Sequence, residues 1–412
     1  MKTALKTTGW TIVAIAGLAA LILAYRNVES SKAPVVFSEK DMLNAIWQRY
    51  KDNYLETGTG RTIDRQRGDV TTSEGEGYTM LRAAWVDDHA TFDSSWKWTR
   101  QNLQFKNGYL FSWLFGKRAD GSYGILVSES GQNSASDADT DIATALLFAY
   151  GRWRDLKYLE AAQNVIGAIW ADDVVEVQGK PYLASDNVEK KFGGSIAVNP
   201  SYFAPYSYRM FATIDTGHDW NALVDDSYAV LKESMAAQLD RPSSDGLPPD
   251  WMAISGASGS VEPLPKSKSQ PNGLKTDFSY DALRVPWRIA LDWQWYKDPR
   301  AKDILDSMTF LTDQWKENMI VYVDYSHDGA PQPSLVQVPA MYGGTIGAFM
   351  AIDPALAKNI YETKLVSMYD PDSDSWKTEL DYYDDNWAWF GMALYDGQLP
   401  NLWEGVISDK NP

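Results

Sequence analysis

Acidic side chains stand at the start of several apolar, helix-like runs in this 412-residue chain. Glu74 begins one such run, and the neighbouring Gly75 and Gly77 allow another backbone or a ligand to approach closely. Asp137 and Asp281 hold the corresponding places before two later runs. Burying a carboxyl group there is costly unless it transfers protons or binds a ligand; the alternative is that it only caps a helix.

Alternating aspartates could also suggest a calcium site. Asp137, Asp139 and Asp141 precede a buried helix, but a calcium-binding hand needs glycine at its sixth position and an acid at its twelfth. This run has Ile142 and Phe148 there, so we do not predict calcium binding.

A second acidic cluster comprises Asp370, Asp372 and Asp374, with Ser375 at the sixth position and Asp381 at the twelfth. Solvated acids in a turn explain it better than calcium does. We therefore predict no metal site and no cofactor.

The bulk composition excludes several other functions. The net charge is −17, from 38 Lys and Arg against 55 Asp and Glu, so the surface should repel nucleic acid. The chain has no cysteine, which excludes disulfides, a thiol nucleophile and a zinc–cysteine site. His89, His218 and His327 are far apart in the sequence, which argues against a histidine metal site or a Ser-His-Asp triad.

The N-terminus has the pattern of an export signal. Lys2 and Lys6 precede an apolar run at residues 10–25, which ends at Arg26. Its length lies between that of a signal-peptide core and that of a membrane span, and no clear cleavage site follows it. We therefore predict a periplasmic or secreted protein, tethered to the cytoplasmic membrane if residues 10–25 are not cleaved, and we favour the tether over a buried core helix.

The rest of the chain predicts one helical domain. We assign residues 1–36 to the signal or anchor and its linker, and residues 37–412 to the folded domain, which opens with an amphipathic helix at 37–54. Six short polar segments, here called polar entries, each lead into a run whose residues are apolar on nearly every face of a helix. Such runs predict buried helices. These runs are residues 78–86, 142–153, 202–214, 282–293, 345–352 and 387–395.

Amphipathic stretches alternate with these buried runs. They lie at residues 92–103, 157–170, 220–238 and 301–315, and their charged faces suit an outer layer. Six inner and six outer helices would form a closed, double-layered all-α toroid with every polar entry at one end, which would form the cleft. The long irregular stretch at residues 241–276 is read as a loop on the rim.

Residues 135–139 read Ala-Ser-Asp-Ala-Asp and lead into a small-apolar helix that ends in an aromatic residue. This run resembles the signature of glycoside hydrolase family 8. Other blocks resemble that family in its order: residues 73–78, 94–98, 109–117, 199–202 and 280–287. The resemblance covers residues 40 to 403 and implies an (α/α)6 toroid and an inverting mechanism.

The resemblance also implies roles for individual residues. The proton donor of the family falls on Glu74, its base on Asp281 and its sugar-positioning aspartate on Asp137. Arg284, one helical turn beyond Asp281, would hold that base charged and oriented, and Tyr280 would form a hydrogen bond near the reacting water.

Four aromatic residues are candidates for sugar binding. Trp113 matches the aromatic residue of the family that stacks on a sugar ring. Tyr382, Tyr383 and Trp387 could supply a further platform, and the alternative for these three is packing in the core.

Two positions depart from the pattern of the family. Glu76 stands where relatives usually carry Gln or Met, and Thr79 stands where Gly is common. Glu76 lies two residues beyond Glu74, so we expect it to point away from the face that Glu74 uses. Its negative charge would nevertheless raise the pKa of Glu74.

The predicted substrate is a β-glucan, because the chain most resembles the family's cellulases encoded beside bacterial cellulose synthases. It would be an endo-β-1,4-glucanase in which Glu74 and Asp281 act as general acid and base. Two alternatives stay open: a xylanase or mixed-linkage β-glucanase of the same family, and a non-catalytic glucan-binding subunit of a polymer synthase. The presence of both carboxyls argues against the second.

Overall fold

The structure is a computed structural model that describes residues 39–189, 194–265, 274–332 and 335–406. The chain divides into two units, Met1–Met42 and Leu43–Pro412, and the helical ring described below belongs to the second. The predicted export segment and the predicted boundary between residues 36 and 37 lie outside the described residues. Within the described parts of the chain, no helix is both long and apolar enough to cross a bilayer.

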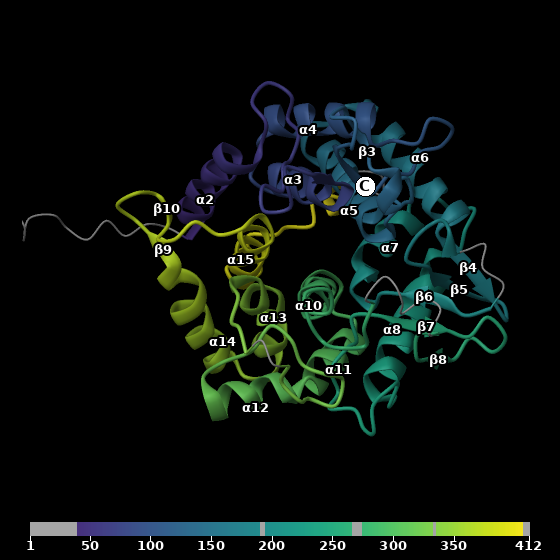
Figure 1. Ribbon diagram of the computed structural model, residues 1–412, viewed down its shortest axis with the longest axis vertical. Helices are drawn as coiled ribbons and strands as arrows, with labels where there is room; N and C mark the ends of the chain where they lie inside the picture. The colour runs from purple at the N-terminus through teal and green to yellow at the C-terminus, as the bar shows by residue number, and fades with distance from the viewer. Residues whose placement is uncertain (1–38, 190–193, 266–273, 333–334, 407–412) are drawn as a thin grey trace, which may run out of the picture. The chain divides into compact units, whose positions relative to one another are not determined.

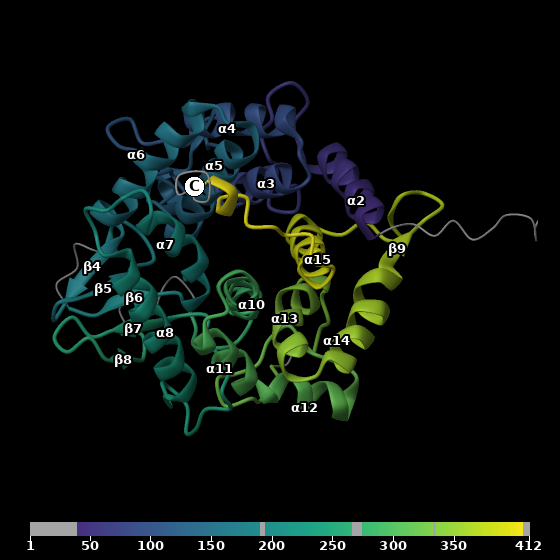
Figure 2. The same ribbon diagram turned by 180° about the vertical axis from the view of Figure 1, so that it is seen from behind.

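Six buried helices form the inner layer of the large unit (Figures 1 and 2). They are α3 (Ser73–Trp85), α5 (Ser136–Trp153), α7 (Pro205–Ala212), α10 (Arg284–Tyr296), α13 (Pro339–Ile352) and α15 (Tyr382–Tyr395). Consecutive members contact each other from α3 through to α15. The ring closes where Tyr78 of α3 packs edge-on against Trp387 and Phe390 of α15. All six predicted inner helices are therefore present.

The outer layer consists of amphipathic helices, each packed beside an inner helix (Figure 1). They are α4 (His89–Asn102), α6 (Leu156–Asp172), α8 (Trp220–Ala236), α11 (Pro299–Ser307) and α14 (Pro354–Ile360). The sixth is α2 (Glu39–Tyr54), whose Leu43 carbonyl accepts a hydrogen bond from Trp389 of α15. This alternation is the predicted (α/α)6 arrangement.

One predicted outer helix is divided. Residues 301–315 form the end of α11 and most of α12 (Thr309–Asn318). The break is at Met308, whose ψ of 43° departs from helical geometry. Beyond α14, the chain continues through η4 (Tyr361–Leu365) and η5 (Val366–Met368). The amphipathic pattern continued across the break because both helices bury one face against the same layer.

Short antiparallel strands join the helices at their ends. The sheet β1-β2-β3 contains Thr71–Thr72, Leu114–Lys117 and Tyr123–Ile125, and β4 (Val174–Val177) pairs with β5 (Lys180–Leu183). A third sheet contains β6 (Ile196–Val198), β7 (Met252–Ile254) and β8 (Val261–Glu262), and the last pairs β9 (Tyr369–Asp370) with β10 (Ser375–Trp376). Two single turns are η1 (Val127–Glu129) and η3 (Pro200–Tyr202).

The described part of the stretch at residues 241–276 contains regular strands that its composition did not predict. Strands β7 and β8 both lie within it, and β7 pairs with β6 in the register Ala197↔Ala253. Met252–Ile254 is fully buried, so the strand gives no alternating pattern in the sequence. The description of this stretch as only a rim loop is therefore wrong.

Buried ion pairs and glycines tie the inner ring together. Arg82 of α3 pairs with Asp385 of α15 at 3.0 Å, and Arg288 of α10 pairs with Asp141 of α5 at 2.7 Å. Where α13 crosses α15, a Cβ atom on Gly343 would lie 1.9 Å from a backbone oxygen of α15. Only glycine permits that approach, so α13 and α15 are fixed relative to each other at this crossing.

Candidate active site

Three carboxylates from three different helix ends meet at one guanidinium. Nη1 of Arg284 donates to Oε2 of Glu74 at 2.7 Å and to Oδ2 of Asp137 at 3.0 Å, and its Nη2 donates to Oδ1 of Asp281 at 2.5 Å. Arg284 opens α10 and is almost completely buried. The sequence predicted its contact with Asp281; the contacts with Glu74 and Asp137 were not predicted.

The sequence around each carboxylate explains its place. Glu74 lies in the first turn of α3, where the Thr72 hydroxyl caps the helix by accepting the Gly75 N–H at 3.0 Å. The Ser73 N–H donates to the Trp113 carbonyl at 3.0 Å, which ties this turn to the chain entering β2. Asp137 lies in the first turn of α5 and accepts the Ala138 N–H at 2.8 Å.

Asp281 lies in the turn that precedes α10. Two residues of the 241–276 stretch contact its carboxylate and the backbone of this turn. Nε1 of Trp251 donates to Oδ2 of Asp281 at 2.9 Å. The Asp250 carboxylate accepts the N–H groups of Ser279 at 3.0 Å and Ala282 at 2.7 Å, on either side of Asp281. Sequence reasoning missed Asp250 and Trp251. The one signal was the apolar segment that follows Asp250 in an otherwise polar stretch.

The three carboxylates differ in how far solvent reaches them. The side chains of Glu74 and Asp281 are 23% and 33% exposed, whereas that of Asp137 is 4% exposed. A molecule that enters from solvent can therefore contact Glu74 and Asp281 before it contacts Asp137.

The surroundings of Glu74 favour its protonated form. Burial raises the pKa of Glu74 to about 7; the Arg284 charge opposes this rise, and the Asp137 and Asp281 carboxylates add to it. A carboxyl with such a pKa can donate a proton near neutral pH.

Glu76 is turned away from Glu74. Its carboxylate points away, as predicted, and accepts the Thr62 N–H at 2.7 Å and the Ser95 hydroxyl at 2.5 Å. Each helical residue turns by about 100°, which separates positions two apart. The largest contributions to the pKa of Glu74 come from burial, Arg284, Asp137 and Asp281, and the predicted effect of the Glu76 charge stays a prediction.

The alternating aspartates at the start of α5 diverge. Asp137 contacts Arg284, Asp139 accepts the Phe111 N–H at 2.9 Å, and Asp141 forms the ion pair with Arg288. Across the described residues, no group of three or more His, Asp or Glu side chains is placed to hold a metal ion.

The predicted aromatic residues separate into two groups. Trp113 is partly exposed, with its indole N–H on the Ser130 carbonyl at 3.0 Å. Tyr280 is exposed, and the Tyr383 ring packs edge-on against it at 6.0 Å while the Tyr383 hydroxyl donates to the Tyr280 carbonyl. These residues can present ring surface to a ligand.

Tyr382 and Trp387 belong to the core instead. Trp387 packs against Tyr78, Trp287 and Phe390, and it is 1% exposed. Tyr382 is also buried. Neither offers a ring face to a sugar, so core packing, the alternative considered for them, describes both.

Tyr202 is a site residue that the sequence analysis did not single out, although it ends one of the family-like blocks. The Arg284 guanidinium carbon lies 5.2 Å from the centre of the Tyr202 ring. Burial raises the pKa of Tyr202, and the charges of Asp137 and Asp281 raise it further. Tyr202 therefore borders the same cluster of carboxylates.

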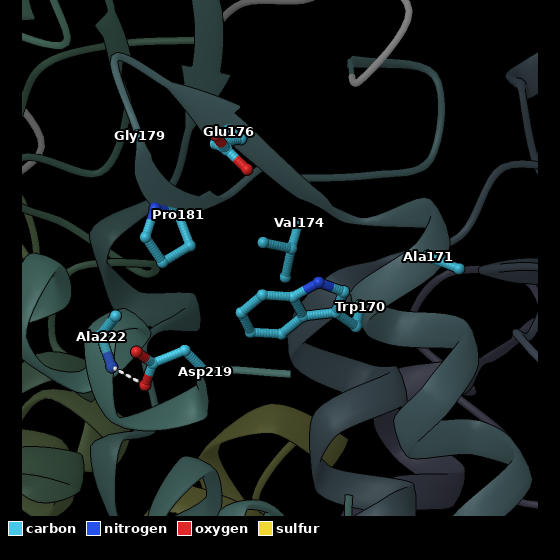
Figure 3. Close-up of a pocket in the computed structure, with 8 residues that line it drawn as sticks. All are labelled: Trp170, Ala171, Val174, Glu176, Gly179, Pro181, Asp219 and Ala222. Carbon is cyan, nitrogen blue, oxygen red and sulfur yellow. Dashed lines mark hydrogen bonds between the residues drawn. The ribbon is translucent and has the colours of Figure 1, made fainter. Parts of the chain in front are cut away.

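A separate pocket of about 360 Å³ lies between α6, the β4-β5 hairpin and the start of α8 (Figure 3). Figure 3 shows the side chains of Trp170, Val174 and Pro181 around it, with Asp219 at its edge. None of the three carboxylates lines it.

Comparison with known proteins agrees with this arrangement. A family model described as glycosyl hydrolases family 8 matches residues 23–397. "Endoglucanase 2" of Ruminiclostridium josui is 29% identical over 404 residues, which cover 91% of this chain and 76% of that protein. "Beta-glucanase" of Niallia circulans is 27% identical over 382 residues, 88% of this chain and 85% of that protein. The solved endo-1,4-D-glucanase from Vibrio fischeri ES114 has the same fold, with a TM-score of 0.69, 24% identity, and coverage of 85% of this chain and 94% of that one.

Proposed function

The chain belongs to glycosyl hydrolases family 8, and on this basis we propose that it is an inverting endo-β-1,4-glucanase with Glu74 as general acid and Asp281 as general base. It is an O-glycosyl hydrolase, and relatives that match most of the chain are named endoglucanases. The observation that carries the assignment of roles is the Arg284 cluster, in which one guanidinium holds three carboxylates and two of them are open to solvent.

Glu74 is suited to protonate the departing glycosidic oxygen. A general acid must carry its proton at the working pH, and burial with two nearby carboxylates raises its pKa to about 7. Its contact with Nη1 of Arg284 holds one carboxyl oxygen, and Arg284 donates no hydrogen bond to the other.

Asp281 is suited to take a proton from the attacking water. Arg284 donates to one of its oxygens and Trp251 to the other, so the carboxylate is held in one orientation. A carboxylate has about four acceptor sites, so Asp281 can still accept a hydrogen bond from water. It is also the most exposed of the three carboxylates.

Asp137, Trp113, Tyr280 and Tyr383 are proposed to hold the sugar. Asp137 lies deepest and is held by Arg284, which suits a group that binds a hydroxyl rather than one that attacks carbon. The partly exposed rings can stack on sugar faces, where C–H groups meet an aromatic surface. No metal or organic cofactor has a role in this proposal.

The polymer preference has a competing candidate. Because "Beta-glucanase" of Niallia circulans also matches most of the chain, a β-glucan other than cellulose is the second candidate substrate, with mixed-linkage barley glucan as its probe. Measuring reducing-sugar release on carboxymethyl cellulose, barley glucan, xylan and chitosan side by side tests both. The fastest release is expected from carboxymethyl cellulose; faster release from barley glucan would favour the second candidate, and no release from any β-glucan would refute the function.

The location of the enzyme follows from the N-terminal pattern. We propose export across the cytoplasmic membrane with a tether at residues 10–25, because a basic start followed by an apolar run is the signal for export. A place beside a bacterial cellulose synthase is consistent with that topology and stays a prediction.

A further inference from the structure

We propose that Asp250 and Trp251 are positioning residues for the general base: Asp250 holds the backbone turn that carries Asp281, and Trp251 holds the Asp281 carboxylate itself. The inference rests on the proposed role of Asp281. It adds two residues to the reaction that come from outside the ring of inner helices.

The first step is the backbone of the turn. The buried Asp250 carboxylate accepts the N–H groups of Ser279 and Ala282 through Oδ1, and the Ser279 hydroxyl donates to its Oδ2. These N–H groups belong to the turn that precedes α10 and carries Asp281, while the N–H groups of Arg284 and Val285 donate to backbone carbonyls of the same turn. Asp250 therefore satisfies the backbone of this turn from a distant segment.

The segment that carries Asp250 is itself fixed to the turn. The Asp250 N–H donates to the Asp277 carbonyl at 2.6 Å, and the Trp251 N–H donates to the Lys275 carbonyl at 2.9 Å. Strand β7 follows directly and pairs with β6. Backbone and side-chain contacts thus join the same two segments, so Asp250 has little freedom to move relative to Asp281.

The second step is the carboxylate of the base. Trp251 Nε1 and Arg284 Nη2 donate to different oxygens of Asp281, at 2.9 and 2.5 Å. Two donors on two oxygens fix the rotation of the carboxylate plane, which a single donor leaves free. The Trp251 ring is held in turn, because it packs edge-on against Tyr202 at 5.8 Å.

The third step is the protonation of Asp250. Burial and the charge of Asp281 both raise the pKa of Asp250 to about 8, so its protonated form predominates at neutral pH. With a proton on Oδ2, the Ser279 hydroxyl oxygen would accept that hydrogen bond instead of donating it, and the repulsion between two neighbouring carboxylates would be removed. An amide should therefore replace this carboxyl better than a methyl group does.

Trp251→Phe tests the indole contact, because it removes the N–H donor and keeps an aromatic ring against Tyr202. We expect kcat to fall roughly 10-fold with KM nearly unchanged, because the base loses one of its two fixed donors while the residues proposed to hold the sugar stay in place.

Trp376→Phe is the matched control. Trp376 also donates its indole N–H to a buried aspartate, Asp385, at 2.7 Å, in a part of the ring that holds no proposed catalytic residue. This variant should have a lower Tm and an unchanged kcat. A wild-type kcat for Trp251→Phe, or an equal fall in kcat for Trp376→Phe, would overturn the role of Trp251.

Asp250→Ala and Asp250→Asn test the turn. Alanine removes every acceptor, so kcat should fall about 100-fold, as expected for a displaced general base. Asparagine keeps an oxygen for the two N–H groups and turns its NH₂ toward Ser279, so kcat should stay within about threefold of wild type. Equal losses in both variants would contradict the positioning role, and if Asp250→Ala does not fold, the Trp251→Phe comparison decides.

Both measurements use the full chain and a soluble β-glucan. Failure of the two proposals can be told apart: a wild-type protein that releases no sugar refutes the proposed function. An active wild-type protein whose Trp251→Phe and Asp250→Ala variants match it refutes only the positioning role.

Discussion

Replacing Arg284 by lysine should separate the chemistry of the site from the stability of the ring. The guanidinium reaches three carboxylates through two nitrogens, at 2.5 to 3.0 Å, from an almost completely buried position. A lysine ammonium is a compact point charge that can keep one of these contacts but cannot span all three. At least one carboxylate would then lose its partner.

The expected magnitude follows from that loss. Breaking a buried ion pair costs about 3–5 kcal/mol, and each hydrogen bond between charged groups contributes about 1.5–3 kcal/mol. We expect Arg284→Lys to lower the free energy of unfolding by about 3 kcal/mol. Because the acid and the base both lose their common support, kcat should fall at least about 10²-fold. Arg284 also lowers the pKa of Glu74, so its weakening should move the alkaline limb of the pH profile to higher pH.

Arg288→Lys provides the control, since Arg288 lies one turn further along α10, is equally buried and pairs with Asp141 and Tyr206 instead. Urea unfolding and initial rates on a soluble β-glucan would be measured for both variants at a temperature at which each is folded. Both should lose stability, and only Arg284→Lys should lose most of its turnover. If Arg284→Lys kept more than about a tenth of wild-type kcat, or if Arg288→Lys lost as much, the guanidinium would not organise the reacting groups.

Glu74→Gln and Asp281→Asn should each reduce hydrolysis by at least about 10²-fold while oligosaccharide binding persists in calorimetry, and a variant with more than about a tenth of wild-type turnover would remove that residue from its role. The first product from a β-linked oligosaccharide should be the α-anomer, because inverting enzymes leave room for a water between base and sugar; an initial β signal in proton NMR would instead indicate a covalent intermediate. A C-terminal reporter that is active only in the cytoplasm should be silent, and a bright fusion would exclude export. Burial raises the pKa of Glu76 to about 7, above its unfolded value of 4.5, so this residue's contribution to stability is lost as pH rises from 4.5 through 7. Glu76→Gln should therefore gain about 3 kcal/mol at pH 8 and nothing at pH 4 in urea unfolding, and equal stability at pH 8 would contradict the raised pKa.

Local sequence determined the helical architecture. The six inner helices were predictable because each is apolar nearly all round and follows a polar entry, and helix periodicity and capping depend only on residues a few positions apart. The same reasoning placed Glu74, Asp137 and Asp281 at the start of inner helices, and therefore at one end of the ring. It also turned Glu76 away from Glu74.

Contacts between distant segments decided the rest. Nothing near Arg284 in the sequence shows that it reaches Glu74 and Asp137, which lie 210 and 147 positions away. Composition cannot tell Trp387, which packs against four aromatic rings, from Tyr280, which stays exposed, because burial depends on which helices pack together. Asp250 and Trp251 reach the base only because β7 pairs with β6 and brings an irregular stretch against the start of α10. Local patterns set where the acids lie along the chain, and long-range packing set which of them share a guanidinium.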